Sequence, residues 1–449
     1  MKIVIVGAGK LGTIFTQALL SSEHEVTVID ISEERLQKLT DRYDIRPVEG
    51  NAVQIEVLKD INIQNYDVLI STTESDEMNI VICHFAKGLG CPRVVARIRA
   101  PEHVAQEDFI RRSMNIDYII NPDMACAKEI ANYLTQKYSL AGGKLVSGRT
   151  AILEIEIDLL PMLIDKALKD IGSDLKDVLI AAVSRNGKII IPNGSTILKA
   201  GDTLYIIGLE KIISEIEARI RKSGRKNTKV KRVMLAGGGK TGLYLAKLLS
   251  QSGLSVKIIE TDRARCELLS QQLDEVLVLN GDATDTSLLE EENISSMDAF
   301  VAVTGFDEEN LLLSLIAKRY GVEDVVTKVS RNSYAPLTES LGVDMIINPL
   351  EICSSTLLRF LEKEGSVIFS KIIQGQAEFV EIVAESSMIL TQMPLAYLKL
   401  PTGVLIASIF RGNDVIIPKG DTQVLPGDRV LMLSLLSSTA DLQALLKRK

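Results

Sequence analysis

Short apolar runs alternate with amphipathic stretches along residues 1–120. The apolar runs are almost uninterrupted, which is typical of parallel strands covered on both faces. Residues 12–22 and 33–43 carry apolar side chains at helical spacing, so they predict helices between the first strands. This alternation favours a doubly wound α/β domain. The predicted strands are residues 3–6, 25–29, 68–72, 94–98 and 118–120.

The first predicted strand runs into a glycine-rich turn, and this element occurs twice. KIVIVGAGKLG at residues 2–12 matches RVMLAGGGKTG at residues 232–242. Other motifs recur at nearly the same offset: TVID and KIIE, GNA and GDA, DEMN and DEEN, YIINP and MIINP. One glycine fingerprint would be a weak signal, but several motifs in register indicate a duplication.

The rest of the chain is duplicated as well. IIIPNGSTILKAGDTLYII at residues 189–207 resembles VIIPKGDTQVLPGDRVLML at residues 415–433, with Pro-x-Gly and Gly-Asp turns between short strands. The predicted fold class is α/β, with two Rossmann-like doubly wound nucleotide-binding domains, each followed by a small α+β domain. The expected Rossmann-like domains are residues 1–138 and 232–364, the small domains are 139–222 and 365–449, and residues 223–231 are a basic linker.

The region around this linker, Arg219–Arg232, holds eight basic residues and no acidic one. A solvated linker is the favoured interpretation. A contact with an acidic surface or with anionic lipid is the alternative.

The glycine turns predict a dinucleotide or adenine-nucleotide site in each half. The first glycine allows a tight turn, the second lets backbone N–H groups approach a pyrophosphate, and the third allows close helix packing. Phosphates then lie at the helix N-terminus. Asp30 and Glu260 end the second strand of each half, where a carboxylate accepts from ribose hydroxyls and repels a 2′-phosphate. We therefore expect NAD, NADH, ATP, ADP or AMP rather than NADP. The alternative is a structural turn without a ligand, which is easier to accept for the second half.

Composition excludes several other functions. The net charge is −8, aromatic residues make up 4% and there is no Trp, so nucleic-acid binding is not expected. The five cysteines show no C-x-x-C spacing, which favours reduced thiols in a cytosolic protein. The three histidines end at His103, so a His-based metal site or catalytic triad is not expected. The apolar runs are also shorter than the roughly 20 residues of a membrane span.

Together these motifs resemble the Trk-type potassium uptake regulators, whose chains contain tandem RCK (or KTN) domains. The resemblance covers essentially the whole chain and rests on GAGKLG, VTVID, GNA, DEMN, RVVARI and INP, and on GGGKTG, GDAT, AVT, DEEN and NP. It implies a non-enzymatic regulatory subunit that senses NAD/NADH and ATP or ADP. It also implies a homo-oligomer, a tetrameric ring, that is cytoplasmic and peripheral to the membrane. There the ring would gate a membrane potassium transporter subunit of the TrkH/TrkG type.

The resemblance also assigns ligand-binding residues, with no catalytic residue and no metal ligand. In the first half these are Gly7, Gly9, Lys10, Leu11 and Gly12 for phosphates, Asp30 for ribose, Asn51 and Ala52 beside adenine, Thr72 and Thr73 over the ligand, and Arg97 for phosphates. The matching second-half residues are Gly237, Gly239, Lys240, Thr241, Gly242, Glu260, Asp282, Ala283, Thr304 and Lys328.

The two halves differ in ways that affect ligand preference. Asn51 stands where the family often has Asp, as at Asp282. Lys328 replaces Arg97 and cannot make a bidentate phosphate contact. A surface salt bridge is the alternative role for Arg97, and N-capping is the favoured role for Asp76 and Asn79.

Two other functional classes compete with the regulator. An NAD-dependent oxidoreductase with a non-standard substrate domain would need an acid–base residue near the nicotinamide, and no histidine follows residue 103. An inert scaffold would not need the acidic and basic residues of the two predicted sites. The regulator is therefore the favoured hypothesis.

Overall fold

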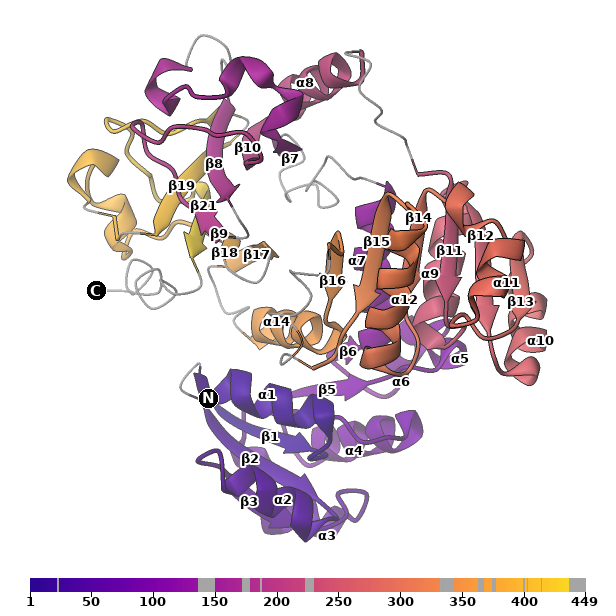
Figure 1. Ribbon diagram of the computed structural model, residues 1–449. Coiled ribbons are helices and arrows are strands. Elements are labelled where there is room, and N and C mark those ends of the chain that lie inside the picture. The colour runs from indigo at the N-terminus through magenta and orange to yellow at the C-terminus, as the bar shows by residue number, and fades with distance from the viewer. Residues whose placement is uncertain are drawn as a thin grey trace. The chain divides into compact units, whose positions relative to one another are not determined.

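A computed structural model defines the fold (Figure 1). It describes residues 1–21, 24–135, 150–171, 178–185, 188–222, 230–331, 334, 342–361, 367–373, 377–398, 400–401, 403–412 and 414–435. The chain divides into two compact units: Met1–Thr135 with Val230–Phe360, and Gln136–Lys229 with Leu361–Lys449. Each unit thus combines matching pieces of the two sequence halves. The predicted linker lies outside the described residues, apart from its last two residues.

The first Rossmann-like domain has a fully parallel sheet with strand order β3-β2-β1-β4-β5-β6. The strand order reverses between β1 and β4, because β2 and β3 lie on one side of β1 and β4 to β6 lie on the other. Doubly wound folds bind ligands at this point. The predicted strands are confirmed, and the sequence prediction missed β3. The strands are β1 (Lys2–Val6), β2 (Glu25–Asp30), β3 (Arg46–Glu49), β4 (Val68–Ser71), β5 (Arg93–Arg97) and β6 (Tyr118–Ile120). The helices are α1 (Lys10–Ser21), α2 (Glu33–Thr40), α3 (Ile55–Asp60), α4 (Asp76–Gly88), α5 (Pro101–Val104), α6 (Glu107–Ser113) and α7 (Pro122–Thr135).

The second Rossmann-like domain repeats this topology, with order β13-β12-β11-β14-β15-β16. Its strands are β11 (Arg232–Ala236), β12 (Ser255–Glu260), β13 (Val276–Asn280), β14 (Ala299–Ala302), β15 (Asp324–Lys328) and β16 (Met345–Ile347). Its helices are α9 (Lys240–Gln251), α10 (Arg263–Gln272), α11 (Thr286–Glu291), α12 (Asp307–Arg319) and α14 (Pro349–Leu361).

The two Rossmann-like domains share a hydrophobic core. Helix α7 ends the first domain and packs against α9, the glycine-turn helix of the second domain. Cys126, Ile130 and Leu134 of α7 join Leu245 and Leu249 of α9 in one buried cluster. The first half therefore supports the helix at the predicted nucleotide site of the second half.

The two small domains form the other unit, and each contains an antiparallel sheet. The first has order β7-β10-β8-β9 and the second has order β17-β18-β21-β19-β20. Ile152, Tyr205 and Ala182 of the first domain share a buried cluster with Phe379 and Leu433 of the second. The first domain consists of β7 (Thr150–Glu156), β8 (Val178–Arg185), β9 (Lys188–Ile190), β10 (Thr203–Leu209) and α8 (Glu210–Lys222); the second has β17 (Val367–Ile373), β18 (Ala377–Val383), β19 (Val404–Arg411), β20 (Asp414–Ile416) and β21 (Arg429–Leu435). Together, the four domains confirm the predicted fold class.

The predicted Gly-Asp turns are held by the same ion pair in both small domains. Arg185 donates to both carboxylate oxygens of Asp202 at 2.7 Å, and Arg411 donates to those of Asp428 at 3.0 and 2.8 Å. Both aspartates are almost fully buried. These bidentate pairs tie the turn before the last strand to the preceding hairpin, so the motif is structural.

Candidate functional site

The first and third glycines of each turn are required by backbone packing. Gly7 and Gly237 have φ angles of +103° and +105°, a region that side chains rarely adopt. A Cβ on Gly12 would lie 1.9 Å from the Gly7 carbonyl oxygen, and one on Gly242 would lie 2.1 Å from that of Gly237. Each turn can therefore pack onto its helix only if its first and third glycine positions are kept as glycine.

The middle glycine of each turn faces open space instead. A Cβ built on Gly9 or Gly239 would meet no heavy atom within 4 Å. Helices α1 and α9 begin at the next residue, so their first N–H groups face the same space. Packing does not explain these two glycines, whereas the close approach of a phosphate to the backbone would.

The acid that ends the second strand is bonded to the glycine turn in both halves. The Ala8 N–H donates to Asp30 Oδ2 at 2.6 Å, and the Ser32 N–H donates to Asp30 Oδ1 at 2.9 Å. Glu260 accepts in the same way from Gly238 and Asp262, at 2.8 and 2.9 Å. These carboxylates are thus fixed beside the open space over the turn, where ribose hydroxyls would be expected.

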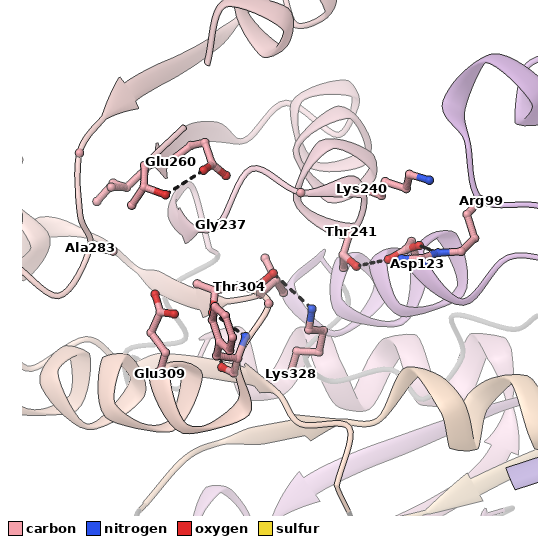
Figure 2. Close-up of a pocket in the computed structure, with 17 residues that line it drawn as sticks. Arg99, Asp123, Gly237, Lys240, Thr241, Glu260, Ala283, Thr304, Glu309 and Lys328 are labelled. Atoms are coloured by element: carbon pink, nitrogen blue, oxygen red, sulfur yellow. Dashed lines mark hydrogen bonds and ion pairs between the residues drawn. The ribbon is translucent and has the colours of Figure 1, made fainter. Parts of the chain in front are cut away.

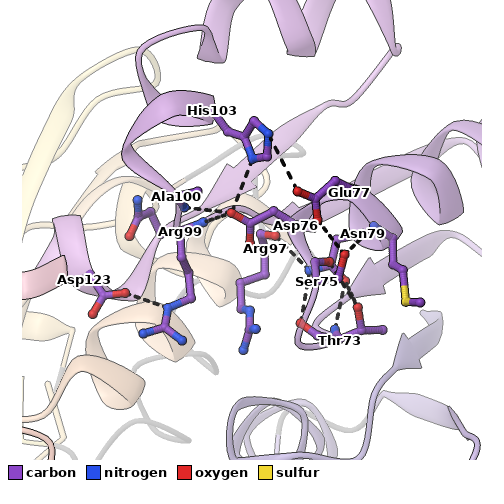
Figure 3. A network of polar contacts seen from close by, with 12 residues as sticks. Thr73, Ser75, Asp76, Glu77, Asn79, Arg97, Arg99, Ala100, His103 and Asp123 are labelled. Carbon is purple, nitrogen blue, oxygen red and sulfur yellow. Dashed lines mark hydrogen bonds and ion pairs between the residues drawn. The ribbon is translucent and has the colours of Figure 1, made fainter. Parts of the chain in front are cut away.

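The DEMN motif positions the strand ends, as Figure 3 shows. Asn79 Oδ1 accepts from the Thr73 N–H at 2.8 Å, and its Nδ2 donates to the Arg97 carbonyl at 2.9 Å. It therefore joins the end of β4 to the end of β5. Asp76 accepts from the Arg99 and Ala100 N–H groups at 2.8 and 2.7 Å.

The predicted N-capping role of Asp76 and Asn79 is therefore wrong. Ser75 is the N-cap of α4, and its hydroxyl accepts from the Met78 N–H. The carboxylate and amide bond instead to loops after neighbouring strands, which local sequence could not show. Asn310 and Asp307 make the equivalent bonds in the second half.

Arg97 ends β5 in this network and is partly buried. Within the described residues its Nε is buried and has no hydrogen-bond partner. Burial, together with the neighbouring Arg99, lowers its pKa, while Asp76 and Asp123 oppose that shift. This is not the geometry of a surface salt bridge, and it leaves a guanidinium able to accept an anionic ligand.

Other first-half candidates are already bonded within the protein. The Thr72 hydroxyl donates to the carbonyls of Val6 and Gly7, and the Thr73 hydroxyl donates to Asn79 Oδ1. Asn51 closes its own turn by accepting from the Val53 N–H. Ala52 and Leu11 are buried, whereas Lys10 is exposed. Ligand contacts for these residues remain predictions.

In the second half, the predicted residues gather around a cavity of about 320 Å³ (Figure 2). The glycine turn and the start of α9 form one part of the wall, and the ends of β12, β14 and β15 form another. Gly242 and Asp282 are not among its lining residues; Asp282 closes a turn with Thr284. The predicted residues that line it are Gly237, Gly239, Lys240, Thr241, Glu260, Ala283, Thr304 and Lys328.

Two further lining residues, Arg99 and Asp123, come from the first half of the chain. Arg99 Nε donates to Asp123 Oδ2 at 2.6 Å, and the Thr241 hydroxyl donates to Asp123 Oδ1 at 2.8 Å. The Tyr244 hydroxyl donates to the Arg99 carbonyl at 2.9 Å. Sequence inspection missed both residues because they reach the cavity through the packing of α7 on α9. The available sequence signal was their position directly after two motifs of the first half, since Arg99 follows RVVARI and Asp123 follows INP.

The charged groups of this cavity influence one another. Burial acts to raise the pKa of Asp123, but the hydrogen bond and charge of Arg99, the Thr241 hydroxyl and Lys328 outweigh it and lower the pKa. Burial lowers the pKa of Lys328, and nearby Cys126 and Asp123 oppose the shift. Asp123 is thus held as a carboxylate within a site lined by basic groups.

Comparison with known proteins places the chain in a family. Sequence models of the TrkA-N domain match residues 3–122 and 233–349, and those of the TrkA-C domain match residues 152–221 and 379–447. The chain belongs to the TrkA family. This confirms the predicted family and the tandem arrangement of its domains.

Relatives of the same length support this assignment. The chain is 35% identical, over 456 residues and 100% of both chains, to the Trk system potassium uptake protein TrkA homolog 1 of Methanosarcina mazei. It is 32% identical over 440 residues to the Trk system potassium uptake protein TrkA of Vibrio alginolyticus, covering 96% of this chain and 95% of the relative.

Solved structures share the fold. The GsuK channel bound to NAD superimposes with a TM-score of 0.64 at 17% identity, covering 99% of this chain and 78% of that chain. The GsuK RCK domain gives a TM-score of 0.63 at 16% identity, covering 100% and 95%. Within the described residues, no helix of this TrkA-family protein has the length and apolar character needed to cross a membrane.

Proposed function

We propose that this TrkA-family protein is a regulatory subunit of potassium uptake that responds to NAD(H) or adenine nucleotides. The cavity of the second half carries the proposal. It combines an open glycine turn, an acid beside that turn and basic groups opposite. Relatives named as Trk potassium uptake proteins and a structural neighbour bound to NAD are consistent with it.

Charge at the two sites favours an unphosphorylated adenosine ribose. Asp30 and Glu260 would accept from the ribose hydroxyls and repel a 2′-phosphate. The open turns would receive the pyrophosphate at the starts of α1 and α9. Arg97 in the first half and Lys328 in the second would neutralise phosphate charge.

Ligand binding would regulate by shifting a conformational equilibrium. A ligand acts only through different affinities for two states, and moving a 1:99 population to 99:1 requires about 5.5 kcal/mol. One hydrogen bond to a charged group contributes roughly 1.5–3 kcal/mol. Several sites in a homo-oligomeric ring could together exceed the requirement. We propose a tetramer at the cytoplasmic face of the membrane, with a TrkH/TrkG-type transporter subunit as the partner.

The alternative of an NAD-dependent oxidoreductase makes a different demand on the same cavity. A hydride-transfer enzyme places an acid–base group beside the nicotinamide. The carboxylate at the far side of the cavity, Asp123, is instead held ionised by Arg99 and bonded to Thr241. A salt-bridged carboxylate of this kind suits a binding site better than proton transfer.

Calorimetric titration of the full chain with NADH, NAD, NADPH, ATP and ADP tests the proposal. We expect binding of NADH or of an adenine nucleotide and much weaker binding of NADPH. Asp30→Asn and Glu260→Gln should each weaken binding at their own site. These variants keep the side-chain size and one of the two oxygen acceptors for backbone N–H groups, whereas alanine would remove both acceptors.

The functional half of the test uses potassium uptake by cells or vesicles that contain the partner transporter. Arg97→Ala should remove the nucleotide dependence of uptake without reducing the amount of folded protein. If no nucleotide bound, or if uptake kept its full nucleotide response when Arg97→Ala and Glu260→Gln were combined in one chain, the proposal would be wrong.

A further inference from the structure

We propose that Asp123 occupies the place of a terminal phosphate in the second cavity, so that this site accepts diphosphates and dinucleotides but disfavours triphosphates. The inference rests on the proposed function and specifies its ligand. It assigns Asp123 as a specificity-determining residue supplied by the other half of the chain. The first site would have no such restriction.

The position of Asp123 suits this role. Thr241 is the second residue of α9, directly after the glycine turn, so its hydroxyl lies where a phosphate at the helix N-terminus would accept a bond. That hydroxyl already donates to Asp123 at 2.8 Å. In Figure 2, Glu260 and Asp123 lie on opposite sides of the drawn residues. A nucleotide with its ribose at Glu260 would therefore extend its phosphates toward Asp123.

The cation nearest this position, Arg99, is also engaged. Arg99 Nε donates to Asp123 Oδ2 at 2.6 Å, which forms a charge-assisted bond. A further phosphate would have to displace the carboxylate from both Thr241 and Arg99, or lie beside it as a second anion. Like charges at close range in a partly buried site are strongly unfavourable. A ligand with two phosphates avoids this conflict.

The first site lacks all three members of this arrangement. The glycine turns align Leu11 with Thr241, and YIINPD against MIINPL aligns Leu350 with Asp123. The backbone bonds of the DEMN and DEEN aspartates align Ser330 with Arg99. The hydroxyl, the carboxylate and the guanidinium are therefore all specific to the second site. All three of these changed residues, Thr241, Asp123 and Arg99, line the cavity. A role limited to joining α7 to α9 would not require this.

The test measures ADP and ATP affinity at the second site of the full chain by calorimetric titration. Gly9→Asp blocks the first site, because its side chain enters open space and places a negative charge where phosphate would bind. In this background we expect ADP to bind roughly tenfold or more tightly than ATP, a difference of about 1.4 kcal/mol. Adding Asp123→Asn should raise ATP affinity by a similar factor and change ADP affinity little.

Glu309→Gln is the matched control, because Glu309 also lines the cavity and the variant loses the same charge. Thr241 and Arg99 are bonded to Asp123 rather than to Glu309. It should leave the ratio of ATP to ADP affinity unchanged. Equal ADP and ATP affinities in the Gly9→Asp chain would overturn the inference even if Asp123→Asn failed to fold. So would an unchanged ratio in a folded Asp123→Asn chain. In either outcome, ADP binding at the second site would leave the proposed function intact. If ADP did not bind there, both the proposed function of the second site and this inference would be overturned.

Discussion

At the scale of single residues, the glycine turns separate packing from ligand binding. Gly12 and Gly242 have no room for a methyl group, whereas Gly9 and Gly239 face open space. We expect Gly12→Ala to destabilise the protein by about 1–3 kcal/mol, because the methyl group must displace the Gly7 carbonyl. Thermal unfolding should show a lower Tm for the unit that contains residue 12.

Gly9→Ala provides the comparison for this prediction. It should leave Tm nearly unchanged, because its backbone does not require glycine and its Cβ meets nothing. Nucleotide affinity at the first site should still fall, because the methyl group takes the space needed by a phosphate. A large loss of Tm in Gly9→Ala, with unchanged nucleotide binding, would contradict the assigned roles.

The partly buried ion pair between Asp123 and Arg99 predicts a dependence of stability on pH. The folded protein holds the pKa of Asp123 below the usual value, which is about 3.9 in unfolded chains. Its contribution is therefore fully present well above that value and is lost as pH falls through the folded pKa. The Tm difference between the parent chain and Asp123→Asn should be constant from pH 7 to about pH 5 and shrink below that range. A difference that grew on acidification would contradict the assignment.

The sequence located residues that lie at a known motif spacing, but it did not show the partners of residues outside such a motif. Asp30 and Glu260 follow from their distance to a glycine turn, so the sequence located them. Asp76 was assigned to a helix cap because no known motif spacing connects it to the loop at residues 99 and 100, to which it is bonded. Asp123 meets Thr241 across 118 residues, and no periodicity connects them.

At the scale of elements, the same distinction holds. The central strands were predicted because both of their faces are buried and their residues are uniformly apolar. Strand β3 was missed because RPVE is mostly exposed at the edge of the sheet. The packing of α7 on α9 could not be read from either helix, because each has an apolar face suited to many partners.

The contact between these helices predicts a measurable role for Tyr244. Burial raises the pKa of its hydroxyl to about 12, so it stays protonated and donates to the Arg99 carbonyl at 2.9 Å. Tyr244→Phe should reduce the free energy of unfolding by about 0.5–1.5 kcal/mol, the usual net value of one such bond. Chemical denaturation should report this loss.

Tyr320→Phe is the control for Tyr244→Phe. Its hydroxyl also bonds to a protein group, Glu290, but on the exposed surface. Solvent replaces such a bond, so no measurable change is expected. Equal losses in the two variants would argue against a special role for the contact between the helices.

At the scale of the whole molecule, the compact units do not follow the order of the sequence. Ile130 and Leu245 belong to different halves of the chain yet share one buried cluster. Ile130→Ala and Leu245→Ala should each cost about 2–5 kcal/mol and lower the same calorimetric transition. Phe379→Ala, in the core shared by the two small domains, should instead lower the transition of the other unit.

This prediction distinguishes two ways in which the chain could unfold. If each compact unit unfolds as a whole, the Ile130 and Leu245 variants should lower the same transition. If each sequence half unfolds as a whole, the Leu245 and Phe379 variants should lower the same transition. Scanning calorimetry of the three variants identifies the grouping. Shared transitions for Leu245→Ala and Phe379→Ala alone would show that the halves, and not the units, are cooperative.

The crossing of α7 onto the other half has a consequence for how such a chain can evolve. If a half-length ancestor paired with a second copy of itself, any residue of the last helix of its Rossmann-like domain would necessarily appear at both nucleotide sites. Gene fusion removes that constraint, because each site then receives its neighbour from a separately encoded segment. Aspartate at position 123 and leucine at position 350 show the outcome. One covalent connection permits two formerly identical sensors to acquire different ligands.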